Sequence, residues 1–306
     1  MSELRDCLPP PAKMNSPYPF AADDDLLARA DRVTALALES GALQPIRTEC
    51  TELSEAGLPF SVRWISSLAL KEQARVDTVI RRDPAFNPFL PPEPALTVAE
   101  LGTDHLVVLN KFPVIARHLL IVTRRYEAQT APLTAADFDA LAAVIRCHGG
   151  LGFYNGGTEA GASQAHKHLQ WVPDHGLGAL AASLPDVREG EVVSSALLPW
   201  RHALVRLPRA WPSAEAGGAM LADAFAAACA RVGLPPAADP MPPYNLLVIR
   251  DWLLLVPRSC EKWTDVSVNS LGFAGSLFAR NCGQIERIRA AGPLAVLAAV
   301  CFPANG

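Results

Sequence analysis

The sequence lacks three features that would assign it to a special class of protein. Its longest apolar run near the carboxyl end, 293–303, is too short to cross a bilayer. Its 27 Lys and Arg residues form no basic block and are outnumbered by 31 Asp and Glu residues, which argues against non-specific nucleic-acid binding. The amino terminus lacks the basic-then-apolar order of a secretory signal. We therefore expect a cytoplasmic protein with neither nucleic acid nor membrane as a partner.

Paired cysteines are also absent. The seven cysteines are odd in number, widely scattered and form no Cys-x-x-Cys pair, so we interpret them as buried thiols and not as a disulfide framework. With 306 residues, half of them hydrophobic, the chain is long enough for two modest domains or one large one. Because the net charge is −4, any polyphosphate ligand must be bound by local groups.

Helix and strand patterns are mixed along the chain, without the regular alternation of a parallel α/β sheet. Helical periodicity and capping residues predict three helices: 23–40, one capped by Thr134 and Asp137 that ends at Gly149, and 219–232. Short apolar runs predict six strands: 60–65, 105–109, 118–123, 151–155, 244–249 and 252–257. Prolines or loss of periodicity predict irregular connections over 87–94 and 176–218, the second with Trp200 and Trp211 as packing anchors. This order is that of an α+β protein.

Two of the predicted hairpins resemble each other. Each has an apolar strand, a turn and a second apolar strand that ends in Val-x-Arg, at 122–124 and at 256–258. This repeat predicts two similar halves in one chain, of which only the first carries a His-x-His pair. Further downstream, 269–280 is expected to begin as a loop and to continue as a helix.

The stretch 153–171 contains the residues that indicate chemistry. In an extended segment side chains alternate between faces, so His166, His168 and Gln170 share one face. Just before them lies a glycine-rich loop, in which Gly161 and its neighbours can turn successive N–H groups toward an anion. A phosphate-binding loop beside two histidines suggests phosphoryl or nucleotidyl transfer.

Two other interpretations compete. The glycines can form a plain turn and the strand can simply carry a polar outer face. The two histidines can also share a metal ion, with His175 as a third ligand, although no cysteine lies nearby and no Asp or Glu shares their face. The glycine loop favours phosphate, and no metal site is predicted.

The residue types on this face fit covalent nucleotidyl transfer. A neutral imidazole attacks phosphorus and also leaves readily, so His168, the middle residue of the three, is the predicted nucleophile and His166 orients the site. Backbone N–H groups of 161–164 and the Ser163 hydroxyl can hold the phosphate oxygens. Gln170 cannot deliver a proton, which suits a reaction whose leaving and attacking groups are both phosphates and favours a transferase or phosphorylase over a hydrolase.

Four segments together carry a family resemblance: 110–122, 154–157, 161–170 and 269–275. With them the chain resembles the diadenosine tetraphosphate (Ap4A) phosphorylase, or ATP adenylyltransferase, family in the transferase branch of the histidine-triad superfamily. The resemblance runs from about residue 60 to the end of the chain. It implies an α+β fold of two fused histidine-triad-like halves, each an antiparallel sheet with packed helices. We accordingly predict an amino-terminal catalytic domain over 1–185 and an ATP adenylyltransferase-type domain over 186–306.

The resemblance also implies an activity, in which Ap4A plus phosphate gives ATP plus ADP, reversibly, through an adenylyl-histidine. It makes His168 the nucleophile, with His166 and Gln170 beside it. It assigns substrate binding to these residues: Lys71, Asn110, Asn155, Gly161, Ala162, Ser163, Gln164, Asn269, Ser270, Leu271, Ser276 and Arg280. The expected ligands are nucleotides and phosphate. No tightly bound cofactor is expected, and any Mg2+ arrives with the polyphosphate.

Two positions depart from the family pattern. Ser276 and Arg280 stand where the family has an apolar residue and a lysine, and arginine binds phosphate as a fork whereas lysine binds it as a point charge. This difference bears on substrate choice.

Two other functions are alternatives to Ap4A phosphorolysis. One is a related nucleotidyltransferase that uses adenosine phosphosulfate or a sugar phosphate, and the other is a nucleotide-binding sensor without catalysis.

Overall fold

The structure is a computed structural model that describes residues 25–46, 48–65, 86–173 and 176–304. Lys71 and His175 lie outside these residues. The α-helices are α1 (Leu26–Glu39), α3 (Ala135–His148), α4 (Leu177–Ser183), α5 (Ala214–Val232), α6 (Ser270–Phe273), α7 (Cys282–Ala291) and α8 (Pro293–Ala298). The strands are β1 (Thr48–Glu55), β2 (Leu58–Ile65), β3 (Thr97–Leu101), β4 (His105–Leu109), β5 (Leu119–Thr123), β6 (Leu151–Gly156), β7 (His168–Val172), β8 (Val192–Val193), β9 (Ala203–Arg206), β10 (Tyr244–Val248), β11 (Trp252–Pro257), β12 (Lys262–Trp263), β13 (Val266–Ser267) and β14 (Ser276–Ala279).

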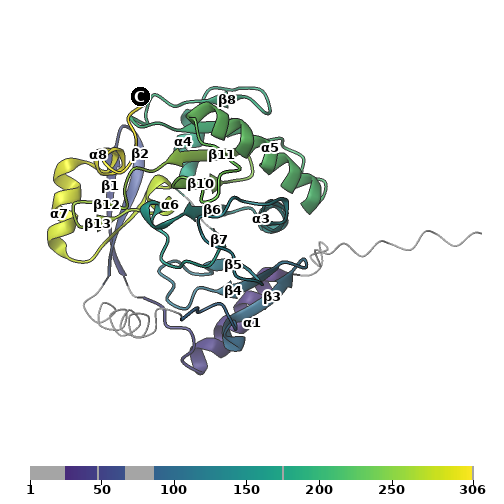
Figure 1. Ribbon diagram of the computed structural model, residues 1–306. Coiled ribbons are helices and arrows are strands. Elements are labelled where there is room, and N and C mark those ends of the chain that lie inside the picture. The colour runs from purple at the N-terminus through teal and green to yellow at the C-terminus, as the bar shows by residue number, and fades with distance from the viewer. Residues whose placement is uncertain (1–24, 47, 66–85, 174–175, 305–306) are drawn as a thin grey trace, which may run out of the picture.

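A nine-stranded sheet forms the centre of the fold (Figure 1). Its order is β3-β4-β5-β7-β6-β10-β11-β9-β8, and all neighbouring strands are antiparallel. Two similar halves meet at the β6–β10 pair, since β4-β5-α3-β6-β7 is followed by β8-β9-α5-β10-β11 in the same arrangement. The predicted α+β fold of two fused halves is therefore confirmed. The hairpin over 244–257, however, takes the place of β6–β7 in the second half and not that of β4–β5.

Local sequence signals define the two long helices that cover this sheet. Thr134 and Asp137 form the predicted capping box of α3, in which each side chain binds the other residue's backbone N–H. Ser213 caps α5 through the N–H of Ala216, and Gly233 ends it with φ +72°. Both helices therefore begin and end where the chain offers a partner for their unpaired backbone groups.

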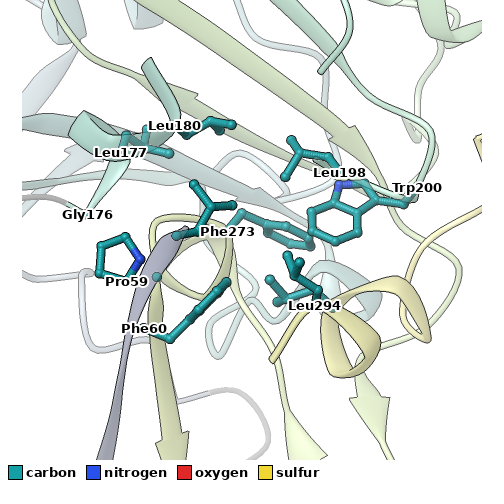
Figure 2. Close-up of a pocket in the computed structure, with 12 residues that line it drawn as sticks. Pro59, Phe60, Gly176, Leu177, Leu180, Leu198, Trp200, Phe273 and Leu294 are labelled. Carbon is teal, nitrogen blue, oxygen red and sulfur yellow. The ribbon is translucent and has the colours of Figure 1, made fainter. Parts of the chain in front are cut away.

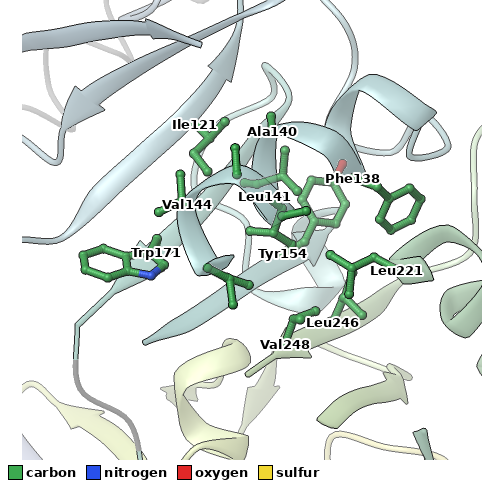
Figure 3. Packing of buried hydrophobic residues seen from close by; sticks show 14 of the residues in the cluster. Ile121, Phe138, Ala140, Leu141, Val144, Tyr154, Trp171, Leu221, Leu246 and Val248 are labelled. Carbon is green, nitrogen blue, oxygen red and sulfur yellow. The ribbon is translucent and has the colours of Figure 1, made fainter. Parts of the chain in front are cut away.

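The two helices and the sheet enclose one large core (Figure 3). The labelled residues come from α3, α5 and alternate positions of the strands, as the two-residue period of a strand requires: Ile121, Phe138, Ala140, Leu141, Val144, Tyr154, Trp171, Leu221, Leu246 and Val248. Complete burial of a Leu, Ile or Val side chain stabilises by roughly 1.5–3 kcal/mol. This core therefore holds strand β7, which carries His168 and Gln170, against α3.

The opposite face of the sheet carries two further apolar clusters. Behind β6, β10 and β11 lies a second core that includes residues of β2, α4, α6, α8 and β14. Among the described residues, the face of β4, β5 and β7 carries the small cluster of Phe89, Val108, Leu120 and Val122. The same face carries His168 and Gln170, which are both buried, because His168 pairs directly with Val122 and Gln170 with Leu120.

Two predicted segments differ from the structure. The stretch 176–218 is not a plain connection, because it contains α4 and the strands β9 and β8, of which β8 lies at the sheet edge, although Trp200 and Trp211 are buried as expected. The stretch 269–280, predicted to begin as a loop and to continue as a helix, begins instead with the short helix α6 and continues as the strand β14. β14 pairs in parallel with β2, so a distant partner decides its conformation.

One sheet continues across the predicted boundary between 1–185 and 186–306, and this division of the chain stays a prediction. None of the described helices is both long and apolar enough to pass through a membrane.

Candidate active site

His168 is the first residue of β7, and its side chain has the geometry of a nucleophile. Its Nδ1 lies 2.8 Å from the carbonyl oxygen of His166, and because a carbonyl only accepts, Nδ1 carries the proton. The lone pair of the ring is therefore on Nε2. Burial lowers the pKa of His168 to about 4, so the ring is neutral near pH 7.

His166 uses both of its ring nitrogens to hold its position. Its Nε2 donates to the carbonyl oxygen of Thr123 at 2.9 Å, and its Nδ1 accepts from Nδ2 of Asn87 at 3.0 Å. Asn87 is fixed in this orientation because its Oδ1 accepts from the N–H of Phe89. His166 thus has no lone pair available for attack or for a metal shared with His168.

Gln170 is oriented by a histidine that sequence reasoning missed. Its Oε1 lies 2.9 Å from Nε2 of His118, and Nδ1 of His118 lies 3.1 Å from Nδ2 of Asn110. The amide of Asn110 donates to Nδ1, so Nε2 of His118 carries the proton and donates to Gln170. Burial lowers the pKa of His118 to about 4, which keeps this chain of three residues uncharged. The NH2 group of Gln170 remains as the end that can donate to a ligand.

The signal for His118 was present, because it lies inside the segment 110–122 that carries the family resemblance. Its role is visible only in the structure, where it orients Gln170, a residue 52 positions away.

The predicted phosphate-binding loop, residues 157–164 and called the phosphate loop below, connects β6 to the histidines. Gly161 adopts φ +86°, and a Cβ there would lie 2.6 Å from the carbonyl oxygen of Val268, so only glycine fits. The N–H groups of Gly161 and Ala162 already donate to the carbonyls of Thr158 and Gly157. Within the described part of the chain, the N–H groups of Ser163 and Gln164 have no acceptor, which narrows the predicted anion-binding groups to these two.

Asn155, on β6, lies in a buried hydrogen-bond cluster that joins the two halves. Its Oδ1 accepts from the N–H of Ser270 at 2.9 Å and from the Ser270 hydroxyl at 2.7 Å. Asn245, its direct partner across the β6–β10 pair, donates to the same oxygen at 2.9 Å. Asn245 also donates to the carbonyl oxygen of Ala160, so this cluster fixes the phosphate loop.

Arg258 supports that cluster from the second half. It follows β11, is 1% exposed, and burial lowers its pKa to about 10, so it remains a cation at neutral pH. Its guanidinium donates to Oδ1 of Asn245 at 2.5 Å and to five carbonyl oxygens, those of Ala160, Cys260, Glu261, Val268 and Val300. Nothing in the sequence pattern around Arg258 or Asn245 indicated these contacts.

The predicted second substrate-binding block divides into two parts. Asn269 caps α6 by accepting from the N–H of Leu271, and it packs against Gly161 of the phosphate loop. Ser276 lies on β14 with its hydroxyl 3.3 Å from that of Ser61, and Arg280 is exposed at the end of this strand. Among the described residues no hydrogen bond joins Ser276 or Arg280 to the histidines.

Away from the histidines, the described residues form no candidate metal site, and a small pocket there is lined by apolar side chains. Within the described ranges, no three His, Cys, Asp or Glu side chains gather closely enough to hold a metal ion. Figure 2 shows a small pocket between β2, α4, α6 and α8, and it is lined by apolar residues such as Phe60, Leu180, Trp200 and Phe273. None of the predicted site residues lines it.

Two family models match the chain in succession. One, described as the Ap4A phosphorylase N-terminal domain, matches residues 17–185, which is more than half of the chain. The other, described as the ATP adenylyltransferase C-terminal domain, matches residues 196–303.

Curated relatives from Saccharomyces cerevisiae agree with this result. Diadenosine 5',5'''-P1,P4-tetraphosphate phosphorylase 2 is 26% identical over 293 residues, which cover 82% of this chain and 86% of the relative. Protein APA1 is 28% identical over 284 residues with the same coverage.

Solved structures show that the fold is shared. Yeast Ap4A phosphorylase Apa2 superimposes with a TM-score of 0.75 at 23% identity, over 92% of this chain and 98% of its own. The same enzyme in complex with AMP gives a TM-score of 0.72 at 24% identity, over 91% and 96%. The sequence resemblance is thereby confirmed, and the chain belongs to the Ap4A phosphorylase family, with an ATP adenylyltransferase C-terminal domain.

Proposed function

We propose that this chain is an enzyme that converts Ap4A and phosphate to ATP and ADP, reversibly, through an adenylyl group carried on His168. The observation that carries the proposal is the state of the His168 ring, which is neutral and has its Nδ1 hydrogen directed at a backbone carbonyl. A ring held in this way presents Nε2 as a nucleophile without any base to remove a proton.

The reaction consists of two displacements at the same phosphorus. In the first, Nε2 of His168 attacks an α-phosphorus of Ap4A, a P–N bond forms, the bridging P–O bond breaks and ATP leaves. In the second, an oxygen of inorganic phosphate attacks the same phosphorus, the P–N bond breaks and ADP leaves. The ring becomes cationic in the intermediate and is neutral again after the second step. ATP leaves as a stable phosphate in the first step, and the neutral imidazole of His168 is the leaving group in the second, so neither step needs a protein acid.

The phosphate loop and Gln170 stabilise the transferred group. The NH2 of Gln170 and the N–H groups of Ser163 and Gln164 are the donors for its oxygens, where negative charge increases in the transition state. The fixed His118–Gln170 contact means that this donor needs no reorientation during the reaction.

The apolar face beside the histidines suits the nucleoside of the transferred group. Phe89, Val108, Leu120 and Val122 form a small buried apolar cluster next to His168, and the Phe89 ring centroid lies 5.5 Å from that of His168. We assign the adenine to this cluster and the ribose to Asn110, with Asn155 behind the phosphate loop. Asn269, Ser270, Leu271, Ser276, Arg280 and Lys71 are assigned to the leaving nucleotide, and Mg2+ is assigned to the polyphosphate.

A His168→Ala variant tests the proposal. Its rate of Ap4A phosphorolysis should fall at least about 1,000-fold, and no protein-bound label should form from Ap4A labelled in its α-phosphates. Equal rates in the two proteins would rule out His168 as the nucleophile. Binding of Ap4A without turnover in the wild type would indicate a sensor. Labelling by UTP as efficient as that by ATP would indicate a nucleotidyltransferase of different specificity.

A further inference from the structure

The catalytic strand separates from its neighbour at the active site. The β6–β7 ladder pairs Leu151 with Val172, Gly152 with Trp171 and Phe153 with Gln170, and it ends there. Two residues further on, Asn155 and His168 would face each other, but each pairs only with its other neighbour, on β10 and β5. An opening in the sheet therefore lies between the two residues, and the phosphate loop begins beside it.

The side chain of Gln129 fills this opening. Its Oε1 accepts from the backbone N–H of His168 at 2.9 Å. Its Nε2 donates to the carbonyl oxygen of Asn155 at 2.8 Å and to that of His168 at 3.3 Å. One amide thus replaces the backbone hydrogen bonds that a continuous ladder would have made between β6 and β7.

Gln129 is itself held firmly. It is 3% exposed, its N–H donates to the carbonyl oxygen of Ala165 at 2.8 Å, and its own carbonyl accepts from the Tyr154 hydroxyl at 2.6 Å. The amide has one possible orientation, because Oε1 meets an N–H and Nε2 meets two carbonyls. A carboxylate of the same shape would have no hydrogen to offer those carbonyls.

We infer that Gln129 is a positioning residue for His168. It keeps β6 and β7 apart at their open end and fixes the backbone of the nucleophile relative to Asn155 and the phosphate loop. The inference rests on the proposed function, since positioning matters only if His168 attacks. A displacement of about 1 Å at a reacting centre can lower a rate about 100-fold, so the loss of this bridge should affect the chemical step more than substrate binding.

The test uses two variants of the full chain. Gln129→Met keeps the length of the side chain without its hydrogen bonds, and Gln129→Glu keeps its shape without the two donated bonds. In single-turnover experiments with α-labelled Ap4A, the rate constant for formation of the adenylyl-enzyme should fall about 10- to 100-fold in both. KM should change less than about threefold.

Tyr154→Phe is the matched control. It removes a buried hydrogen bond to the backbone of Gln129 and leaves the amide bridge in place, so it should lower the melting temperature but keep the rate constant within about twofold of wild type. All rates are measured well below the lowest melting temperature. Rate constants near wild type in both folded Gln129 variants would overturn the inference. An equal loss in Tyr154→Phe would also overturn it, because stability alone would then explain the effect. A wild type that forms no adduct would instead overturn the proposed function.

Discussion

In the proposed reaction Gln170 presents an amide to the transferred phosphate, and the contact with His118 decides which end of that amide is presented. A histidine at position 170 would still accept a hydrogen bond from His118 through one ring nitrogen, and the other nitrogen could then carry a proton. Such a proton can be delivered to a leaving group, which the amide cannot do.

Gln170→His should therefore gain hydrolysis relative to phosphorolysis. General acid–base assistance is worth roughly 100- to 10,000-fold, so an increase of the ratio by at least about tenfold is expected. The measurement is the yield of AMP against that of ADP from Ap4A at fixed phosphate. His118→Gln serves as a control, because it keeps a donor to Gln170 and should not change the ratio. An unchanged ratio in Gln170→His would contradict the role assigned to the amide.

Single residues differ in how far the sequence can predict them. His166, His168 and Gln170 were recognisable because alternation alone places them on one face of a strand. Gln129 was not, because its partner His168 lies 39 positions away and an isolated glutamine has no pattern. The prediction that all four N–H groups of 161–164 bind phosphate was too broad, because two of them donate to carbonyl oxygens within the loop itself.

At the scale of elements, a buried ion pair attaches the start of β7 to α3. Lys167 points away from the two histidines beside it, and its Nζ lies 3.2 Å from Oδ2 of Asp137 and 2.6 Å from Oε2 of Glu127. Burial raises the pKa of Asp137, but hydrogen bonds from His105 and Thr134 and the charge of Lys167 outweigh it, so the pKa is lowered overall. Both Lys167 and Asp137 are almost fully buried, whereas Glu127 is 41% exposed.

Lys167→Met should lower the free energy of unfolding by about 3–5 kcal/mol, because it leaves the Asp137 carboxylate buried without its cation. Glu127→Gln, which removes the half-exposed partner of the same ammonium group, should cost less than about 1 kcal/mol. Urea unfolding of the two variants at pH 7 measures both values. A Lys167→Met protein within about 1 kcal/mol of wild type would show that Asp137 is sufficiently stabilised by His105 and Thr134.

Elements were predictable where local signals decide them. The start of α3 follows from its capping box, and β4 and β5 follow from adjacent apolar runs. β14 was missed because its partner β2 is more than 200 positions away, as the Ser61–Ser276 contact shows, and because four residues carry little periodicity. β8, at the sheet edge, and β9, next to it, with two and four residues, were missed for the second reason.

At the scale of the whole molecule, the two halves share one sheet but have different tasks. The first half supplies the histidines, and the second supplies Asn245, Ser270 and Arg258, which bind Asn155 and the phosphate loop from behind. The sequence repeat pointed to two halves but aligned the wrong hairpins, because Val-x-Arg is too short to distinguish one apolar hairpin from another. The contact between the halves could not be predicted, since it consists of single polar residues that are far apart in the chain.

The buried neutral histidines make the stability of the whole molecule depend on pH. Burial lowers the pKa of both His118 and His168 from 6.5 to about 4. Between these values the unfolded chain binds protons that the folded chain excludes, so stability should fall as pH decreases from about 6.5 to 4. Each of these two histidines contributes a slope of up to about 1.4 kcal/mol per pH unit in that window and none above it.

Urea midpoints should therefore be nearly constant from pH 7 to 8 and should fall steadily from pH 6.5 to 4.5. His118→Gln removes one of the two groups while it preserves a donor to Gln170, so its midpoint should fall less steeply over the same range. The rate of adenylyl-enzyme formation should stay high through most of this range, because His168 becomes protonated only near pH 4 in the folded protein. If the rate fell with a midpoint near pH 6.5, His168 would titrate as an exposed histidine, and the neutral nucleophile proposed for this site would be wrong.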